Sequence, residues 1–318
     1  MNGAIPTDAQ SSQLNKLTSK TSLSIAIGFL TIYLAWLLGV VGIRSDHISF
    51  LAILMVGFVA SPISRKFIMG FIFFWMFWII YDAMRIYPNY MVNDIHIEDL
   101  YNLEKSIFGF SYNGTIVTPN EYFKLNEKTW LDILSGFFYL TWVPLPMIYA
   151  AYLFFTDKEM MLRFTACFLF ANLFGFVIYY LFPAAPPWYV YEHGFVQNFD
   201  IPGSEAQLAN FDSFVGSPIF ANMYTKNANV FAAIPSLHSA YPVVLFYFGL
   251  KKKYKIASII FLIDIIGIWF AAVYSMHHYI IDVILGAFSA IIAIFVFEKV
   301  LMRTSLRKYL KRYVNFIS

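Results

Sequence analysis

Charged residues and cysteines are scarce in this chain of 318 residues. Asp, Glu, Lys and Arg make up only 13% of it, against roughly a quarter in an ordinary soluble domain, so a freely soluble globular protein is excluded. The formal charge of +3 is too small to indicate a nucleic-acid partner. The one cysteine, Cys167, lies within an apolar run, which leaves neither a disulfide framework nor a cysteine metal site.

Apolar residues, in contrast, make up 59% of the chain and aromatic residues 20%. A membrane-spanning helix needs about 20 mostly apolar residues, and the sequence supplies several such stretches. We therefore predict an all-α, polytopic transmembrane helical bundle of six to eight spans, with eight as the best count because the second stretch is short. The apolar windows fall at 22–43, 48–63, 67–86, 131–155, 162–182, 234–250, 256–274 and 279–301.

These windows divide the chain into three parts. Residues 1–21 form a polar N-terminal tail, 22–301 the transmembrane domain, and 302–318 a basic C-terminal tail. No cleavage signal of small residues follows the first apolar run, which we interpret as a retained anchor. The basic run from Arg303 to Arg312 fits either an amphipathic helix on the anionic inner leaflet or a solvated charged tail.

Basic residues gather on one side of the predicted bundle. With eight spans and a cytoplasmic N-terminus, most of the 22 Lys and Arg residues fall on the cytoplasmic side, where such an excess is expected. Both tails are then cytoplasmic. The two long polar loops, 87–129 and 183–233, face away from the cytoplasm.

Two histidines stand at the starts of apolar windows that run in the same direction. Pro235 suits the first turn of a helix, and His238 follows within about one turn. His278 and Asp282 are four residues apart, so on a helix they share a face and the carboxylate can fix the imidazole tautomer. Free N–H groups at both helix starts favour an anion such as phosphate.

This arrangement predicts phosphoryl transfer at the non-cytoplasmic face. His278, oriented by Asp282, is the predicted nucleophile, which attacks phosphorus to give a phosphohistidine. His238 is the predicted general acid that protonates the departing oxygen, and then the base for the incoming hydroxyl. No metal or cofactor is needed for this chemistry. The alternative is that each of these residues is structural, as single interfacial histidines usually are.

The stretches Pro235-Ser236-Leu237-His238 and His278-Tyr279-Ile280-Ile281-Asp282 resemble the second and third signatures of the type 2 phosphatidic acid phosphatase superfamily. The doubled histidine and the loop Pro183-Ala184-Ala185-Pro186-Pro187-Trp188-Tyr189 are closer to its inositol phosphorylceramide synthase branch. The resemblance covers most of residues 80–290 and implies a six-helix core within the bundle.

Two phosphate-binding arginines of the phosphatase branch are missing here. The chain has no Arg-Pro pair, and Ala272 stands six residues before His278. Arg85 fits an interfacial anchor as well as a phosphate ligand, and His277 fits a packing or capping role. The side chains near the outer face that are predicted to bind the substrate in place of the arginines are Ser236, Tyr274, His277, Arg85 and Lys226.

The resemblance implies a lipid phosphotransferase that moves an inositol-phosphate headgroup from a phospholipid donor to the hydroxyl of a ceramide-like acceptor. Both lipids are apolar, so the site must open to the bilayer and exclude water, which would turn transfer into hydrolysis. Pro187 and Trp188 either wall such a lipid slot or belong to an interfacial aromatic belt. The alternatives are a lipid or polyprenyl phosphate phosphatase with the same histidines, and a non-catalytic membrane protein such as a transporter. No obligate protein partner is implied.

Short loops favour a bacterial inner-membrane protein with a periplasmic site. The sequon Asn113-Gly114-Thr115 keeps a Golgi membrane with a lumenal site as the alternative. Both place the site on the non-cytoplasmic face of an integral membrane protein.

Overall fold

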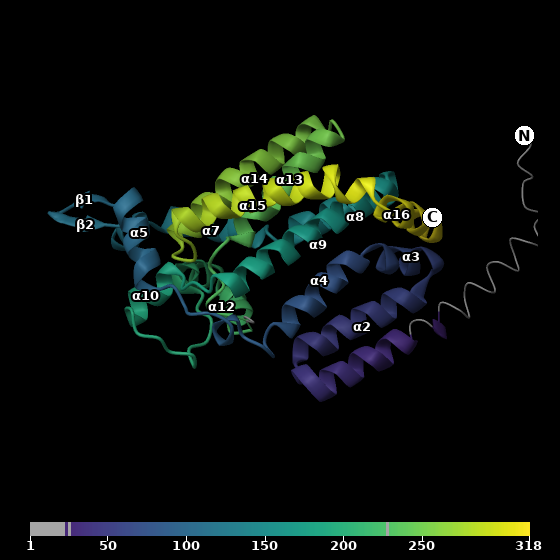
Figure 1. Ribbon diagram of the computed structural model, residues 1–318, viewed down its shortest axis with the longest axis horizontal. Coiled ribbons are helices and arrows are strands. Elements are labelled where there is room, and N and C mark those ends of the chain that lie inside the picture. The colour runs from purple at the N-terminus through teal and green to yellow at the C-terminus, as the bar shows by residue number, and fades with distance from the viewer. Residues whose placement is uncertain (1–22, 25–26, 227–228) are drawn as a thin grey trace, which may run out of the picture. The chain divides into compact units, whose positions relative to one another are not determined.

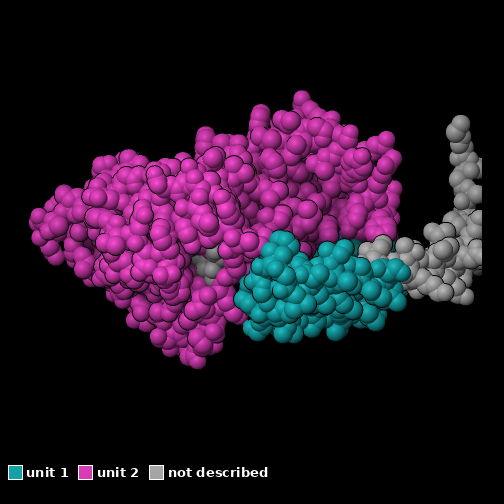
Figure 2. Space-filling view, turned by 60° about the horizontal axis from the view of Figure 1, so that its bottom comes forward, with its two compact units in different colours: residues 1–69 teal, residues 70–318 magenta. Residues whose placement is uncertain are grey.

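The computed structural model describes residues 23–24, 27–226 and 229–318. It divides the chain into two compact units, Met1–Met69 and Gly70–Ser318, which Figure 2 shows in different colours. The predicted N-terminal tail, 1–21, lies outside the described residues.

The first unit consists of helices. Its elements are the helix Ile27–Val41, which ends in the π-helical turn Leu37–Val41, helix α2 (Ser45–Ala60) and all but the last residue of α3 (Pro62–Gly70). Tyr33, Leu37, Leu54 and Phe58 are buried apolar residues of this unit.

The second unit is built around a bundle of apolar helices. Helix α13 packs against α14, α15, α9 and α8, while α7 packs against α14 and α4 against α9. Leu245, Phe248 and Ile268 are among the buried side chains of this core. The helices of the bundle are α4 (Ile72–Ala83), α7 (Thr129–Leu140), α8 (Pro144–Thr156), α9 (Lys158–Leu181), α13 (Leu237–Lys251), α14 (Lys255–Tyr274) and α15 (Ile280–Lys299).

The two long polar loops fold into short helices and a hairpin at one end of this bundle (Figure 1). The hairpin strands are antiparallel, and the turn residues Asn113 and Gly114 both have positive φ, as a two-residue hairpin turn requires. The first loop contributes η2 (Asn89–Met91), α5 (Glu98–Phe108), β1 (Phe110–Tyr112), β2 (Thr115–Val117) and α6 (Pro119–Leu125). The second loop contributes α10 (Pro187–His193), η3 (Ala206–Leu208), α11 (Ala209–Val215) and α12 (Ile219–Tyr224).

The opposite end of the bundle is basic. Lys251, at the end of α13, and Arg163, in α9, both pair with Glu298 near the end of α15, at 2.5 and 2.6 Å. The C-terminal run forms η4 (Leu301–Arg303) and α16 (Leu306–Ile317), which lies at this end and packs against α9 (Figure 1). Helix α16 buries Leu310 and Ile317 and exposes its cations, so it is amphipathic, although Tyr309 and Phe316 are exposed; its contact with lipid headgroups stays a prediction.

Every predicted apolar window coincides with a helix or a pair of helices. Among the described residues, α9, α14 and the segment Ile280–Arg303 are long and apolar enough to cross a membrane by themselves. The pairs α3–α4 and α7–α8 qualify when each is counted as one bent span, which gives up to five. An all-α, polytopic membrane fold is thus confirmed, while the number of eight spans stays a prediction.

Helices α13 and α15 begin later than predicted. Ser236 is the N-cap of α13, so the helix starts at Leu237, and the prediction that Pro235 opens its first turn is wrong. Serine is a strongly preferred N-cap, and this preference places the proline just outside the helix. Tyr279 is the N-cap of α15, so His278 precedes that helix instead of lying on it.

The starts of α13 and α15 lie in direct backbone contact. The Ser236 N–H donates to the Asp282 carbonyl at 3.0 Å, and Ser239 Oγ lies 3.0 Å from the Val283 carbonyl. A Cβ atom at Gly286 would stand 2.1 Å from both the Ser236 carbonyl oxygen and Ser239 Oγ. Glycine at this position is therefore what permits the close approach of the two helices.

We predict that Gly286→Ala destabilises the protein, because the new methyl group must push α13 away from α15. Overpacking of this kind costs about 1–3 kcal/mol, so the unfolding midpoint in detergent should fall by a few degrees. Gly39→Ala is the matched control, since a Cβ atom there meets nothing within 4 Å. Equal midpoints for the two variants would contradict the close approach.

Candidate active site

His238 and His278 lie side by side at the junction of α13 and α15. His238 is the second residue of α13 and is partly exposed, whereas His278 lies in the loop between α14 and α15 and is buried. His238 Nδ1 lies 3.2 Å from His278 Nε2, and the ring centroids are 5.4 Å apart. Two imidazole nitrogens that face each other in this way can both contact one group placed between them.

Asp282 contacts the other side of the His278 ring. Its Oδ2 lies 3.5 Å from His278 Nδ1, which is longer than a normal hydrogen bond, and accepts the Tyr279 N–H at 2.8 Å. The Asp282 side chain is fully buried. An ionised carboxylate in this place favours positive charge on the neighbouring ring; the orienting role of Asp282 stays a prediction.

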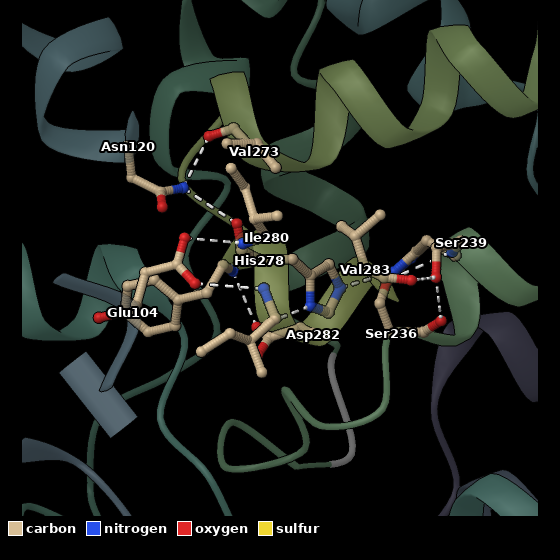
Figure 3. Close-up of polar contacts among 12 residues, drawn as sticks. Glu104, Asn120, Ser236, Ser239, Val273, His278, Ile280, Asp282 and Val283 are labelled. Atoms are coloured by element: carbon tan, nitrogen blue, oxygen red, sulfur yellow. Dashed lines mark hydrogen bonds and ion pairs between the residues drawn. The ribbon is translucent and has the colours of Figure 1, made fainter. Parts of the chain in front are cut away.

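Glu104, in α5, holds the start of α15 (Figure 3). Its buried carboxylate accepts the N–H groups of Ile280 (3.0 Å) and Ile281 (3.2 Å). Burial raises the Glu104 pKa to about 7; the two N–H donors lower it, and the negative charge of Asp282 raises it. Glu104 was not predicted; the available signal is its position four residues after Leu100, on the buried face of α5.

The loop between α14 and α15 carries His277 and His278, and we call it the histidine loop. Asn120, in α6, connects the end of α14 to this loop (Figure 3). Its Nδ2 donates to the carbonyls of Val273 (2.8 Å) and His278 (2.9 Å). Helix α6 begins with a capping box, in which Thr118 Oγ1 accepts the Glu121 N–H and the Glu121 carboxylate accepts the Thr118 N–H. Asn120 was not predicted, because 158 positions separate it from His278 and no local pattern links the two residues.

Tyr139 and Trp142, from the end of α7 and the turn after it, line His238. The Tyr139 hydroxyl oxygen lies 3.2 Å from His238 Nδ1, and the Trp142 ring meets the His238 ring edge-on with centroids 4.9 Å apart. Tyr139 is fully buried. Neither residue was predicted, since 99 positions separate Tyr139 from His238 and no local pattern links them.

His277 stacks against two tyrosines. Its ring centroid lies 4.3 Å from that of Tyr224 and 5.3 Å from that of Tyr139, and its Nε2 lies 3.1 Å from the Glu205 carbonyl oxygen. Burial lowers the His277 pKa well below its usual value, and the adjacent histidines lower it further, so the ring is neutral. These are packing contacts; binding of a substrate by His277 stays a prediction.

Ser236 and Tyr274, both predicted to bind substrate, have partners within the fold. Ser236 is fully buried as the N-cap of α13. The Tyr274 hydroxyl donates to Asp132 Oδ1 at 2.8 Å and accepts the Lys128 N–H at 3.1 Å. These bonds tie the start of α7 to the end of α14. A contact of either residue with a substrate stays a prediction.

Arg85 braces the second outer loop. Its Nε donates to Asp82 Oδ1 at 3.0 Å, and its Nη2 donates to the backbone carbonyl of Lys226. The Lys226 side chain is exposed. Arg85 therefore fixes the chain two residues after Tyr224, and the roles of Arg85 and Lys226 as phosphate ligands stay predictions.

The Pro-Pro-Trp loop lies against the histidine loop. Pro187 opens α10, and the Trp188 N–H donates to the Met276 carbonyl at 2.9 Å. Trp188 is only 4% exposed, so it belongs to the interior and not to an exposed aromatic belt. Pro187 lines a pocket of about 290 Å³ together with Met276 and Tyr279, which are neighbours of the histidines. This placement favours the wall for Pro187; a contact of Trp188 with a lipid slot stays a prediction.

The N-terminus of α15 has fewer N–H groups available to an anion than predicted. Asp282 takes the N–H of Tyr279, and Glu104 takes those of Ile280 and Ile281. The prediction that free N–H groups at this helix start bind phosphate is therefore wrong. Two carboxylates occupy the place that an anion would need.

The histidine pair is compatible with the predicted roles of nucleophile and proton carrier, which stay predictions. Burial lowers the pKa of His278 to about 3, so its ring is neutral and its Nε2 lone pair is available at neutral pH. His238, which faces it, can carry a proton to or from a group between the rings. In the part of the chain that the structure describes, no three His, Cys, Asp or Glu residues are grouped as metal ligands.

Comparisons with known proteins agree on a family. The model of the PAP2 superfamily matches residues 116–296. The chain is 43% identical over 306 residues to a phosphoinositol dihydroceramide synthase of Bacteroides thetaiotaomicron, which covers 95% of this chain and 100% of that protein. It is 32% identical over 180 residues to the inositol phosphorylceramide synthase of Candida albicans (53% of this chain, 36% of that one). For the catalytic subunit of the Saccharomyces cerevisiae inositol phosphorylceramide synthase, the identity is 34% over 119 residues (36% and 29%). No solved structure matches the chain.

We predict that Glu104→Ala destabilises the protein, because it leaves the N–H groups of Ile280 and Ile281 buried without acceptors. Each such group costs about 1–3 kcal/mol, which thermal unfolding in detergent will detect. Glu104→Gln keeps one carbonyl acceptor and should lose less. The matched control, Glu98→Gln on the exposed face of the same helix, should leave the midpoint unchanged. A wild-type midpoint for Glu104→Ala would show that Glu104 does not hold α15.

Proposed function

The chain belongs to the PAP2 superfamily, and from this premise we propose that it transfers an inositol-phosphate headgroup from a phospholipid donor to the hydroxyl of a ceramide-like acceptor. The observation that carries the proposal is the 3.2 Å contact between His238 Nδ1 and His278 Nε2, with Asp282 behind His278. The bacterial relative that matches nearly the whole chain is named as a synthase of this kind, which supports the same lipid class here.

In the first step, the Nε2 lone pair of His278 attacks phosphorus, and the P–O bond to the diacylglycerol oxygen breaks. Protonated His238 gives its Nδ1 proton to that oxygen, so diacylglycerol leaves as a neutral alcohol. His278 then carries the headgroup as a phosphohistidine. The charge of Asp282, on the Nδ1 side of the ring, stabilises the positive charge that His278 acquires.

In the second step, neutral His238 takes the proton of the acceptor hydroxyl, and the acceptor oxygen attacks phosphorus. The P–N bond breaks, His278 regains its lone pair, and the headgroup is now joined to the acceptor. One phosphodiester has replaced another, so the reaction needs neither a redox partner nor an energy source. Ping-pong kinetics are the expected signature of the covalent intermediate.

Hydrolysis is the second candidate function, since water in place of the lipid hydroxyl would complete the same cycle. The partial exposure of His238 is the observation that favours it. Tyr139 and Trp142 cover part of the same ring, and exclusion of water by such groups favours transfer.

We also infer that the site faces away from the cytoplasm. The histidines lie at the ends of α13 and α15 opposite to Lys251 and Glu298, where Arg163 also lies. Helix ends rich in Lys and Arg stay on the cytoplasmic side. In a bacterial inner membrane this orientation places the site on the periplasmic side, and in a Golgi membrane on the lumenal side.

We predict that the purified protein releases more than about one equivalent of diacylglycerol from phosphatidylinositol only when ceramide is present, because without an acceptor the phosphohistidine stops the cycle after its first step. His278→Ala removes the nucleophile and Asp282→Asn removes the balancing charge, so each should lower the transfer rate by about a hundredfold or more. His193→Ala, in α10, is the control histidine variant and should keep wild-type activity.

Other outcomes of this assay separate the alternatives. Release of diacylglycerol and inositol phosphate without ceramide would favour hydrolysis. No turnover in the wild type or in His278→Ala would leave a non-catalytic membrane protein. Full transfer activity in His278→Ala or Asp282→Asn would contradict the assigned roles.

We predict that kcat/KM falls on the acid side only well below about pH 6.5, the ordinary pKa of a histidine. Because burial lowers the His278 pKa to about 3, this nucleophile stays neutral as the pH falls towards that value. The rate should be measured in the Glu104→Gln background, which removes a carboxyl group with a pKa of about 7. A fall of unit slope with its midpoint near pH ~6.5 would mean that His278 titrates as an exposed histidine does.

A further inference from the structure

Two of the side chains predicted to replace the missing arginines already have partners within the fold. The Tyr274 hydroxyl is bonded to Asp132, and the Arg85 guanidinium to Asp82 and a backbone carbonyl. Glu104 fills the start of α15. Side chains that lie at the histidine pair itself are therefore the next candidates for ligands of the phosphate oxygens.

The Tyr139 side chain lies at the histidine pair, and its contact with His238 limits the direction in which its hydroxyl proton can point. The Tyr139 hydroxyl oxygen and His278 Nε2 both lie 3.2 Å from one nitrogen, His238 Nδ1. An imidazole nitrogen is either a donor or an acceptor at one time. If His278 Nε2 keeps its lone pair for attack, His238 Nδ1 carries the proton that points to it. The Tyr139 hydroxyl then faces an N–H, to which it cannot donate, and its own proton is left for another acceptor.

A phosphoryl group between the rings supplies that acceptor. Reacting atoms approach to about 3–3.5 Å before bond formation, so phosphorus in line with His278 Nε2 requires the two nitrogens to separate. His238 is partly exposed and His278 is buried, so the movement falls to His238. Tyr139, which is fully buried in the wall of the site, stays in place and faces the oxygens of the group.

Tyr224 brings a second hydroxyl to the same place. Its ring stacks on His277 at 4.3 Å, as that of Tyr139 does at 5.3 Å, and the two tyrosine hydroxyls lie close enough to interact. The Tyr224 side chain is half-buried, whereas that of Tyr139 is fully buried. The bond from Arg85 to the Lys226 carbonyl holds the chain two residues further on.

We propose that the hydroxyls of Tyr139 and Tyr224 bind the non-bridging oxygens of the transferred phosphoryl group, in place of arginines. The inference rests on the proposed phosphoryl transfer but not on which lipid carries the group. His277, which lies next to the nucleophile, acts as the platform against which both tyrosine rings are positioned.

The lack of a guanidinium at the oxygens also indicates the class of substrate. Phenolic hydroxyls are neutral donors, so among the described residues in contact with the two rings a protonated His238 supplies the positive charge, while Asp282 lies behind His278. A phosphodiester carries one negative charge, whereas a phosphomonoester carries about 1.5–2 near neutral pH. The site therefore matches phosphodiester lipids such as phosphatidylinositol better than monoesters such as phosphatidic acid.

Orthovanadate, which adopts the five-coordinate geometry of phosphoryl transfer, tests the oxygen ligands without any lipid. Its affinity for the purified protein is measured by calorimetry in wild type, Tyr139→Phe and Tyr224→Phe. A hydrogen bond to a charged group is worth about 1.5–3 kcal/mol, so each variant should bind vanadate about tenfold or more weakly. Tyr149→Phe is the matched control, because Tyr149 is a buried tyrosine of α8 that packs against Phe164 and Phe261.

The possible results of this experiment support or overturn the proposal as follows. Wild-type vanadate affinity in both variants overturns the proposal. A Tyr139→Phe variant that transfers slowly but binds vanadate normally overturns it too, because Tyr139 would then only orient His238. If Tyr139→Phe does not fold, the half-buried Tyr224 carries the test. Turnover of phosphatidic acid as fast as phosphatidylinositol overturns the charge argument. Tyrosine-dependent vanadate binding without transfer between any lipids supports this site while the proposed function fails.

Discussion

The backbone contact between the starts of α13 and α15 is the constraint on which the whole site depends. The bond from Ser236 N–H to the Asp282 carbonyl joins two segments that each carry a histidine within a few residues. Gly286 allows this approach because any Cβ there would overlap the Ser236 carbonyl. Since His238 lies two residues after one end of this bond and His278 four before the other, the backbone keeps the two histidines close to each other.

The short helices of the two polar loops hold the histidine loop in place. In the histidine loop, between α14 and α15, the N–H groups of His277 and His278 bond to the Ala272 carbonyl of α14, and other backbone groups at this junction have partners from outside the bundle. Glu104 and Asn120 supply them from the first polar loop, and the Trp188 N–H, which donates to the Met276 carbonyl, comes from the second. A loop held on several sides keeps the nucleophile in one orientation, which is what preorganisation requires.

The sequence predicted those features whose signals are local. Apolar runs gave the helices, and the spacing of His278 and Asp282 gave their contact, although His278 lies before α15 and not on it. The start of α13 was misplaced because Pro235 and Ser236 both favour a helix start, at different positions. Tyr139 and Glu104 could not be predicted, because they reach the site from 99 and 177 positions away through tertiary packing.

The two histidines differ in exposure. In the proposed mechanism, this difference determines the order in which the two lipids pass through the site. His278 is buried against Asp282, whereas His238 is partly exposed between Tyr139 and Trp142. In the proposed mechanism, both the departing and the incoming alcohol exchange a proton with His238, so both would pass on its side of the histidine pair. One passage that serves two lipids in turn would require the first product to leave before the acceptor enters. The proposed covalent intermediate on the buried ring would hold the headgroup during that exchange.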